Sequence, residues 1–196
     1  MKLLTREELL PPDQYELQRQ AIRARIITLK QRRRIGLGPM VTMVFENRDT
    51  LMFQIQEMIR VERILSPVKV QEELDVYNAL MPERDELSAT LLIEITDQDK
   101  IKESLDRFMG LDRSQTVAIL AGAEQVFGMF EKGHSHATKI SAVHFIRFRP
   151  TASMRRAFAD LLQPVSLWID HNGYRSEVQV PGSMREEWLA DLACQA

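Results

Sequence analysis

The stretch Val165–Val180, VSLWIDHNGYRSEVQV, decides the fold class, because it has the pattern of two strands joined by a tight turn. Asn172-Gly173 at its centre suits a type I′ turn, in which both central residues need a positive φ angle. Hairpins of this kind join antiparallel neighbours in a sheet. We therefore expect antiparallel pairing near the C-terminal end of the chain.

Other stretches show the same strand-like character and short connections. The stretch 116–132 predicts a second hairpin, and the stretches 88–95 and 141–149 each predict one strand. Gly38-Pro39 marks a turn before Met40–Phe45, whose nearly continuous apolar character predicts a strand that is mostly covered. Successive strands with short turns favour an antiparallel sheet.

Helical patterns alternate with these strands. Predicted helices begin near Asp13, at Asp49 or Thr50, at Ser66-Pro67, and at Ser183, which can form a capping box with Glu186. The predicted fold class is therefore α+β, a mainly antiparallel sheet with helices packed on one side.

Length and composition fit one domain, residues 1–196, with room for a helical part, 1–87, packed on a sheet-rich part, 88–196. The one cysteine, Cys194, excludes a disulfide or a cysteine-held cluster within the chain. The N-terminus lacks the pattern of a signal peptide, and no apolar run has the length of a spanning helix. We expect a cytoplasmic protein without a membrane segment.

Charge is distributed unevenly along the chain. Residues 1–64 carry 12 Lys and Arg against 8 Asp and Glu, whereas residues 65–196 carry 14 against 20. On the first long helix, a basic stripe lies beside the apolar face at helical spacing. The stripe consists of Arg19, Arg23, Lys30 and Arg34. Two interpretations of the stripe stay open, a partner surface and a solvated or internally paired face. Aromatic residues for base stacking are absent from this segment apart from Tyr15, which argues against nucleic-acid binding.

A polar corner follows the strand Met40–Phe45. It consists of Glu46, Asn47, Arg48 and Asp49, at the start of a predicted helix. A helix N-terminus with an arginine can bind an anion, and the carboxylates can move protons. The same residues can equally cap the helix and pair with one another, so the corner is either a binding site or a structural turn.

The helix after this corner places Glu62 near the centre of its apolar stripe, while Glu57 and Arg60 lie on the opposite side, where they can pair. A carboxylate on an apolar face needs a partner or a proton. Arg63 or the preceding basic helix can supply an internal salt bridge. The alternative is a carboxylate-bridged metal held together with Glu72, Glu73 and Asp75 of the next helix, although the Glu-x-x-His pairs of di-iron bundles are missing.

The histidines are scattered. His134 and His136 share a glycine-containing loop, either as an exposed loop or as two ligands of one metal. His144 alternates with apolar residues along a strand, either as a core histidine or as a proton shuttle opposite Glu94. The sequence contains neither a G-x-S-x-G nucleophile elbow nor a dinucleotide fingerprint.

Seven stretches together resemble an uncharacterised bacterial family known only as a domain of unknown function. They are LTREELL, LKQRRRIGLGP, FENRDT, QIQEMIRVERI, QEELDVYNALMP, SAVHFIRF and IDHNGY. Genes of that family often lie beside those for a rubrerythrin-like protein and a cysteine-rich iron–sulfur protein of the heterodisulfide-reductase type. The resemblance implies a role near peroxide or thiol redox chemistry, with any redox centre in a partner.

Two functions follow as hypotheses. The first is a non-catalytic accessory or binding protein of a redox or iron system, without a cofactor of its own, that uses the basic stripe and the neighbouring corner. The alternative is a small metal-binding protein or enzyme. It requires that five groups from separate elements converge in one pocket: Glu46, Arg48, Glu62, Glu94 and His144.

Overall fold

The computed structural model describes residues 1–113, 115–131 and 140–194. His134 and His136 lie outside the described residues. Within them the chain is an α+β protein with two antiparallel sheets, which confirms the predicted class. No described helix combines the length and the apolar character needed to traverse a bilayer.

The larger sheet has five strands in the order β1-β2-β3-β7-β6. These strands are β1 (Arg34–Gly36), β2 (Val41–Glu46), β3 (Leu87–Ile93), β7 (Val143–Phe148) and β6 (Met129–Phe130). The smaller sheet has the order β5-β4-β8-β9. Its strands are β5 (Glu124–Phe127), β4 (Val117–Ala121), β8 (Val165–His171) and β9 (Tyr174–Gln179).

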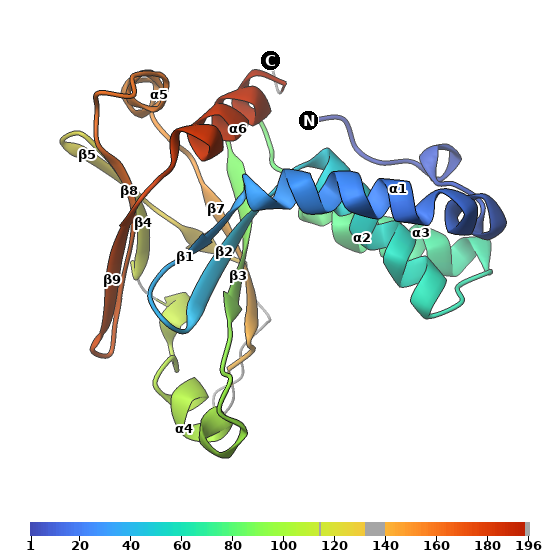
Figure 1. Cartoon of the computed structure of the whole chain (residues 1–196), viewed down its shortest axis with the longest axis horizontal. Helices are drawn as coiled ribbons and strands as arrows, with labels where there is room; N and C mark the ends of the chain where they lie inside the picture. Colours follow the sequence, from blue (N-terminus) through green and yellow to red (C-terminus); the bar gives the residue numbers. More distant parts are fainter. Residues whose placement is uncertain (114, 132–139, 195–196) are drawn as a thin grey trace.

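Helices α1, α2 and α3 form a layer beyond the five-stranded sheet, on the side away from the four-stranded sheet, while α5 and α6 lie at one end of the two sheets (Figure 1). The α-helices are α1 (Pro12–Gln31), α2 (Arg48–Val61), α3 (Pro67–Ala79), α4 (Ile101–Asp106), α5 (Ala152–Ala159) and α6 (Gly182–Ala193). Short 3₁₀ turns are η1 (Arg6–Glu8), η2 (Gln98–Lys100) and η3 (Leu111–Arg113).

The hairpin of β8 and β9 is formed as predicted. Asn172 and Gly173 have φ angles of 46° and 77°, and His171 pairs with Tyr174 across the turn. These positive angles give the turn the twist of the adjacent strands, which a type I′ turn requires. The predicted hairpin in 116–132 is also present, as β4 and β5.

Each face of the five-stranded sheet has a different composition. The inner face packs against the four-stranded sheet in one apolar cluster that includes Met43, Phe45 and Leu91. The outer face meets a second, smaller cluster built mainly from α2 and α3. Every residue of β2 is buried, because this strand is covered on both faces. This agrees with the expected coverage of Met40–Phe45.

Helix starts differ from the predictions at two positions. Asn47, rather than Asp49 or Thr50, caps α2, because its side chain accepts a hydrogen bond from the Thr50 N–H at 3.0 Å. Helix α6 begins at Gly182 after Pro181, without a side-chain cap from Ser183. Strand β2 pairs with β1 on one side and with β3 on the other, so the five-stranded sheet contains strands from both sides of residue 87.

A buried arginine joins the end of α1 to α6. Arg33 is 1% exposed and donates two hydrogen bonds of 2.8 Å to the carboxylate of Asp191 and one of 2.8 Å to Glu187. The fork of the guanidinium matches the two carboxylate oxygens, which makes such pairs the strong ones. Its neighbour Arg32 is exposed and pairs with Glu186 at 2.7 Å and with Glu187 at 3.2 Å.

We expect Arg33→Met to lower the free energy of unfolding by about 3 kcal/mol, because it leaves the buried Asp191 without its counter-ion. Arg32→Met is the matched control and should change the free energy by no more than about 1 kcal/mol, since its ion pairs are largely solvated. Urea unfolding followed by circular dichroism measures both values. Equal effects of the two variants would contradict the proposed anchor.

Candidate functional site

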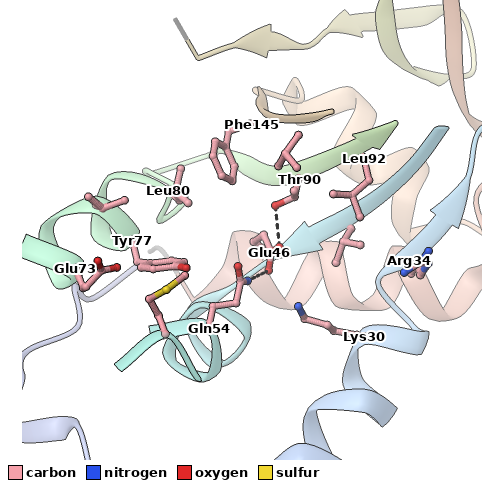
Figure 2. A pocket seen from close by; sticks show the side chains of 14 residues that line it. Lys30, Arg34, Glu46, Gln54, Glu73, Tyr77, Leu80, Thr90, Leu92 and Phe145 are labelled. Atoms are coloured by element: carbon pink, nitrogen blue, oxygen red, sulfur yellow. Dashed lines mark hydrogen bonds between the residues drawn. The ribbon is translucent and has the colours of Figure 1, made fainter. Parts of the chain in front are cut away.

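A pocket of about 520 Å³ lies between the outer face of the five-stranded sheet and helices α1, α2 and α3 (Figure 2). Apolar side chains from the sheet and from two helices form most of its walls. They are Val44, Leu92, Val143 and Phe145 from the strands, and Met58, Val76 and Leu80 from the helices and the end of α3. Its size and its mixture of apolar walls with a few polar groups are typical of small-molecule sites.

Glu46 supplies the carboxylate of this pocket. Side chains alternate along β2, so Val44 and Glu46 point towards the helices while Phe45 points into the inner core. Glu46 is 3% exposed and accepts hydrogen bonds from the Thr90 hydroxyl at 2.9 Å and from the Gln54 amide at 3.0 Å (Figure 2). Both donors are neutral.

Three acidic residues are buried, and Glu46 differs from the other two. Glu86 pairs with Arg147 at 2.6 Å and Arg149 at 3.1 Å, and Asp191 pairs with Arg33. In the part of the chain that the structure describes, no basic side chain forms an ion pair with Glu46. A buried charge held only by neutral donors is costly.

The basic side of the pocket comes from the end of α1 and from β1. Lys30 lines the pocket from the end of α1, and its side chain points towards Glu46 (Figure 2). Arg34 also lines the pocket, but its guanidinium binds Glu94 at 2.8 Å. The Thr42 hydroxyl at 2.6 Å and Arg34 lower the pKa of Glu94. Arg34 is thus neutralised, and Lys30 has no ion pair among the described residues.

Helix α3 contributes Tyr77 and Glu73, which lie one helical turn apart on the face that borders the pocket. Burial raises the pKa of Tyr77, and the nearby carboxylates of Glu73, Glu46 and Glu62 raise it further. The phenol is therefore protonated at neutral pH. From the sequence, Glu73 was considered only as a metal ligand with Glu62, and Tyr77 was missed, although Tyr77 and Leu74 share the buried side of this helix.

The structure separates the four residues of the predicted polar corner. Glu46 points into the pocket, whereas Asn47 caps α2 and Asp49 is exposed at the surface. Arg48 binds Glu8 at 2.6 Å and the carbonyl of Lys2 at 3.2 Å, so it holds the N-terminal segment. Of the four residues only Glu46 therefore lines the pocket, while Asn47 and Arg48 have structural roles.

Glu62 does not lie on the buried face of α2, contrary to the expectation. The helix ends at Val61, and Arg63 adopts a left-handed conformation with φ 53°. Glu62 is consequently an exposed residue at the end of the helix. The helical spacing that placed Glu62 among apolar residues does not apply to it, because the helix ends one residue before Glu62.

The predicted pair of Glu57 and Arg60 is present, with a distance of 3.3 Å. Arg19 also binds Glu57 at 2.8 Å, and the Tyr15 hydroxyl donates to it at 2.8 Å. The bond from Arg19 is the main cause that lowers the pKa of Glu57 to about 2. This cluster fastens α1 to α2.

Glu94 and His144 lie on opposite faces of the sheet, so of the two alternatives His144 is a core histidine and not a proton shuttle opposite Glu94. His144 pairs with Leu91 across β3 and β7 and faces the inner core, where its Nε2 lies 2.8 Å from the Ser141 carbonyl oxygen. Residues that face each other in an antiparallel pair share one side of the sheet, and Glu94 is three positions from Leu91. The five residues that the alternative function requires in one pocket therefore do not converge: Glu46, Arg48, Glu62, Glu94 and His144.

The basic stripe is likewise divided among several roles. Arg19 binds Glu57, Arg34 binds Glu94, Lys30 lines the pocket, and Arg23 is exposed. Within residues 1–113, 115–131 and 140–194, no group of three or more His, Cys, Asp or Glu side chains is arranged to hold a metal ion.

Comparison with known proteins gives one family and a solved relative. Residues 3–192 match the family described as "Protein of unknown function (DUF3501)". The chain is similar to a crystal structure of a novel protein of unknown function from Burkholderia pseudomallei K96243, with 30% identity and a TM-score of 0.88. That alignment covers 97% of this chain and 100% of the other. No curated protein matches the chain.

We expect Glu46→Gln to raise the free energy of unfolding, by on the order of 1 kcal/mol, because it removes a buried charge that lacks a cationic partner. Glu177→Gln is the matched control, since Glu177 accepts a hydrogen bond from Ser166 across two strands of the other sheet but is exposed. Urea unfolding compares the variants. A loss of stability in Glu46→Gln alone would show that the carboxylate is structural.

Proposed function

This chain belongs to the DUF3501 family, and we propose that it is a binding protein whose pocket between the five-stranded sheet and helices α1 to α3 holds a small organic molecule. Glu46 is the observation that carries this proposal. Its charge is buried beside an open volume, and the two other buried acids each have an arginine. Residues that a fold keeps at a cost in stability are characteristic of functional sites.

The composition of the pocket favours binding over covalent catalysis. Serine and cysteine, the most common nucleophiles, and histidine, the most common general base, are missing from the residues that line it. The alternative function, an enzyme that uses a carboxylate, a histidine and an arginine together, requires His144, which faces the inner core. The lining instead offers hydrogen bonds and apolar contact.

The test uses the fluorescent dye anilinonaphthalene sulfonate, whose aromatic body and single anionic group suit the apolar walls and Lys30. We expect saturable one-site fluorescence enhancement in the wild-type protein. Leu92→Trp fills the pocket from β3 and should weaken dye binding by at least about tenfold, which corresponds to the loss of roughly 1.4 kcal/mol of contact energy.

Leu120→Trp is the control for that variant, because it places the same side chain on β4 of the other sheet, away from the pocket. It should bind the dye as the wild-type protein does. If both tryptophan variants bind equally well, or if the dye shows no saturable binding, the pocket is not a ligand site.

The association with a rubrerythrin-like protein and a cysteine-rich iron–sulfur protein remains part of this proposal. It is supported by the family resemblance, and the exposed basic residues of α1 offer a surface for an acidic partner. Arg23 is the clearest member of that surface, because Arg19 and Arg34 are occupied by internal ion pairs. Electrostatic contacts of this kind act mainly on association rate and depend on salt.

Co-purification with the two partner classes at low salt tests the association. We expect the wild-type protein to retain them and Arg23→Glu to retain several-fold less, because it replaces attraction by repulsion. Arg84→Glu, on an exposed loop away from α1, should behave as the wild-type protein. No retention by the wild-type protein at low salt, or equal retention by all three proteins, would exclude this surface.

A further inference from the structure

We infer that the ligand of the pocket is a small zwitterion with an apolar body, in which an ammonium group and a carboxylate lie close together, as in a free apolar α-amino acid. The inference rests on the proposed binding function and specifies its chemistry. It follows from the arrangement of opposite charges around one cavity, with apolar walls beside them.

The acidic side of the cavity fits an ammonium group. Glu46 uses one oxygen for Thr90 and the other for Gln54, and each carboxylate oxygen has a second lone pair. Glu73 and the hydroxyl of Tyr77 border the same space. An ammonium group has three donors and a positive charge, so it can satisfy these acceptors and supply the counter-ion that Glu46 lacks.

The basic side of the cavity fits an anionic group. Lys30 lines the same cavity and points towards Glu46 (Figure 2), and the two side chains form no ion pair in the part of the chain that the structure describes. A ligand in the cavity must present an acceptor to Lys30 and a donor to Glu46 at the same time. Adjacent ammonium and carboxylate groups meet this requirement within one small molecule.

The walls and the balance of charge exclude other ligand classes. A nucleotide or a polyphosphate needs several free cations, and Arg34 is already bound to Glu94. A polyamine would meet repulsion from Lys30. An aliphatic or aromatic side chain of the ligand, in contrast, finds contact with Leu92 and Phe145 on the sheet and with Leu80 at the end of α3.

Three probes with the same aromatic body separate the contributions of the two charges. They are L-phenylalanine, which carries both charges, phenethylamine, which carries only the ammonium, and phenylpropionate, which carries only the carboxylate. We expect isothermal titration calorimetry to give the highest affinity for L-phenylalanine, by at least about tenfold over either analogue, because each charge-assisted hydrogen bond that is lost has that effect.

Two substitutions then assign each charge to its partner. Glu46→Gln should weaken L-phenylalanine by at least about tenfold and leave phenylpropionate unchanged, whereas Lys30→Met should weaken L-phenylalanine and leave phenethylamine unchanged or tighter. Glu177→Gln and Lys102→Met change the same residue types outside the pocket and should bind as the wild-type protein. Circular dichroism confirms that every variant is folded.

Several results would overturn the inference. If phenethylamine or phenylpropionate binds as tightly as L-phenylalanine, the site recognises a single charge. If none of the three binds while the naphthalene dye still binds the pocket, the ligand class is wrong and the binding function stands. If Lys30→Met alone lowers stability and no probe binds, Lys30 is the internal counter-ion of Glu46.

Discussion

The need to cover both faces of the five-stranded sheet is the constraint on which the rest of the structure depends. Its inner face is apolar and closes against the four-stranded sheet, in a core that includes Phe45, Leu91 and Ile146. Its outer face carries Thr42, Glu46, Ser88 and Thr90 as well as apolar side chains, so α1, α2 and α3 cannot seal it as a dry interface. Close packing requires apolar and complementary surfaces, and where these are interrupted by polar groups a cavity can persist. The pocket is therefore a consequence of the alternation along β2 and β3, where every second residue faces the helices.

The buried and half-buried carboxylates of the protein differ in their hydrogen-bond donors, and Glu46 differs from those that join elements of the fold. Arginines bridge the remote elements: Arg33 joins α1 to α6, Arg19 joins α1 to α2, and Arg147 joins β7 to Glu86. In each case the carboxylate receives a guanidinium, whose geometry compensates for its desolvation. Glu46 receives a hydroxyl and an amide instead. That contrast with Glu86 and Asp191, which are buried to a similar degree, is a stronger argument than the presence of a cavity alone.

Local chemistry made much of this fold predictable, while the site required information that no single segment contains. The turn at Asn172-Gly173 and the coverage of β2 follow from a few neighbouring residues, since backbone conformation and side-chain alternation are local properties. The division into two sheets was not predicted, because alternation tells which side of a strand is buried but not which partner covers it.

Glu46, Lys30 and Arg34 were singled out for different reasons, and only the tertiary structure places them around one volume. Tyr77 was missed because its helix shows no unusual pattern in isolation, and Glu73 was considered only as a metal ligand with Glu62. Glu62 was misplaced because a helical period says nothing about where the helix ends.

Separate interactions hold each wall of the pocket, which bears on how it would bind. Helix α1 is fixed through Glu57 and Arg33, and the Asn47 cap fixes the start of α2. The end of α3 is held by Arg147, which donates to the carbonyl of Ala79 and, at 3.2 Å, to that of Met81. None of these contacts uses Lys30, Glu46 or Tyr77. A ligand would therefore meet walls that are already ordered, so little of its binding energy would be lost in arranging them. The site is preformed, and its charged groups are not used in the contacts that hold the walls. Such a site favours selective binding of a small molecule, because specificity then arises from the match of charges rather than from closure around the ligand.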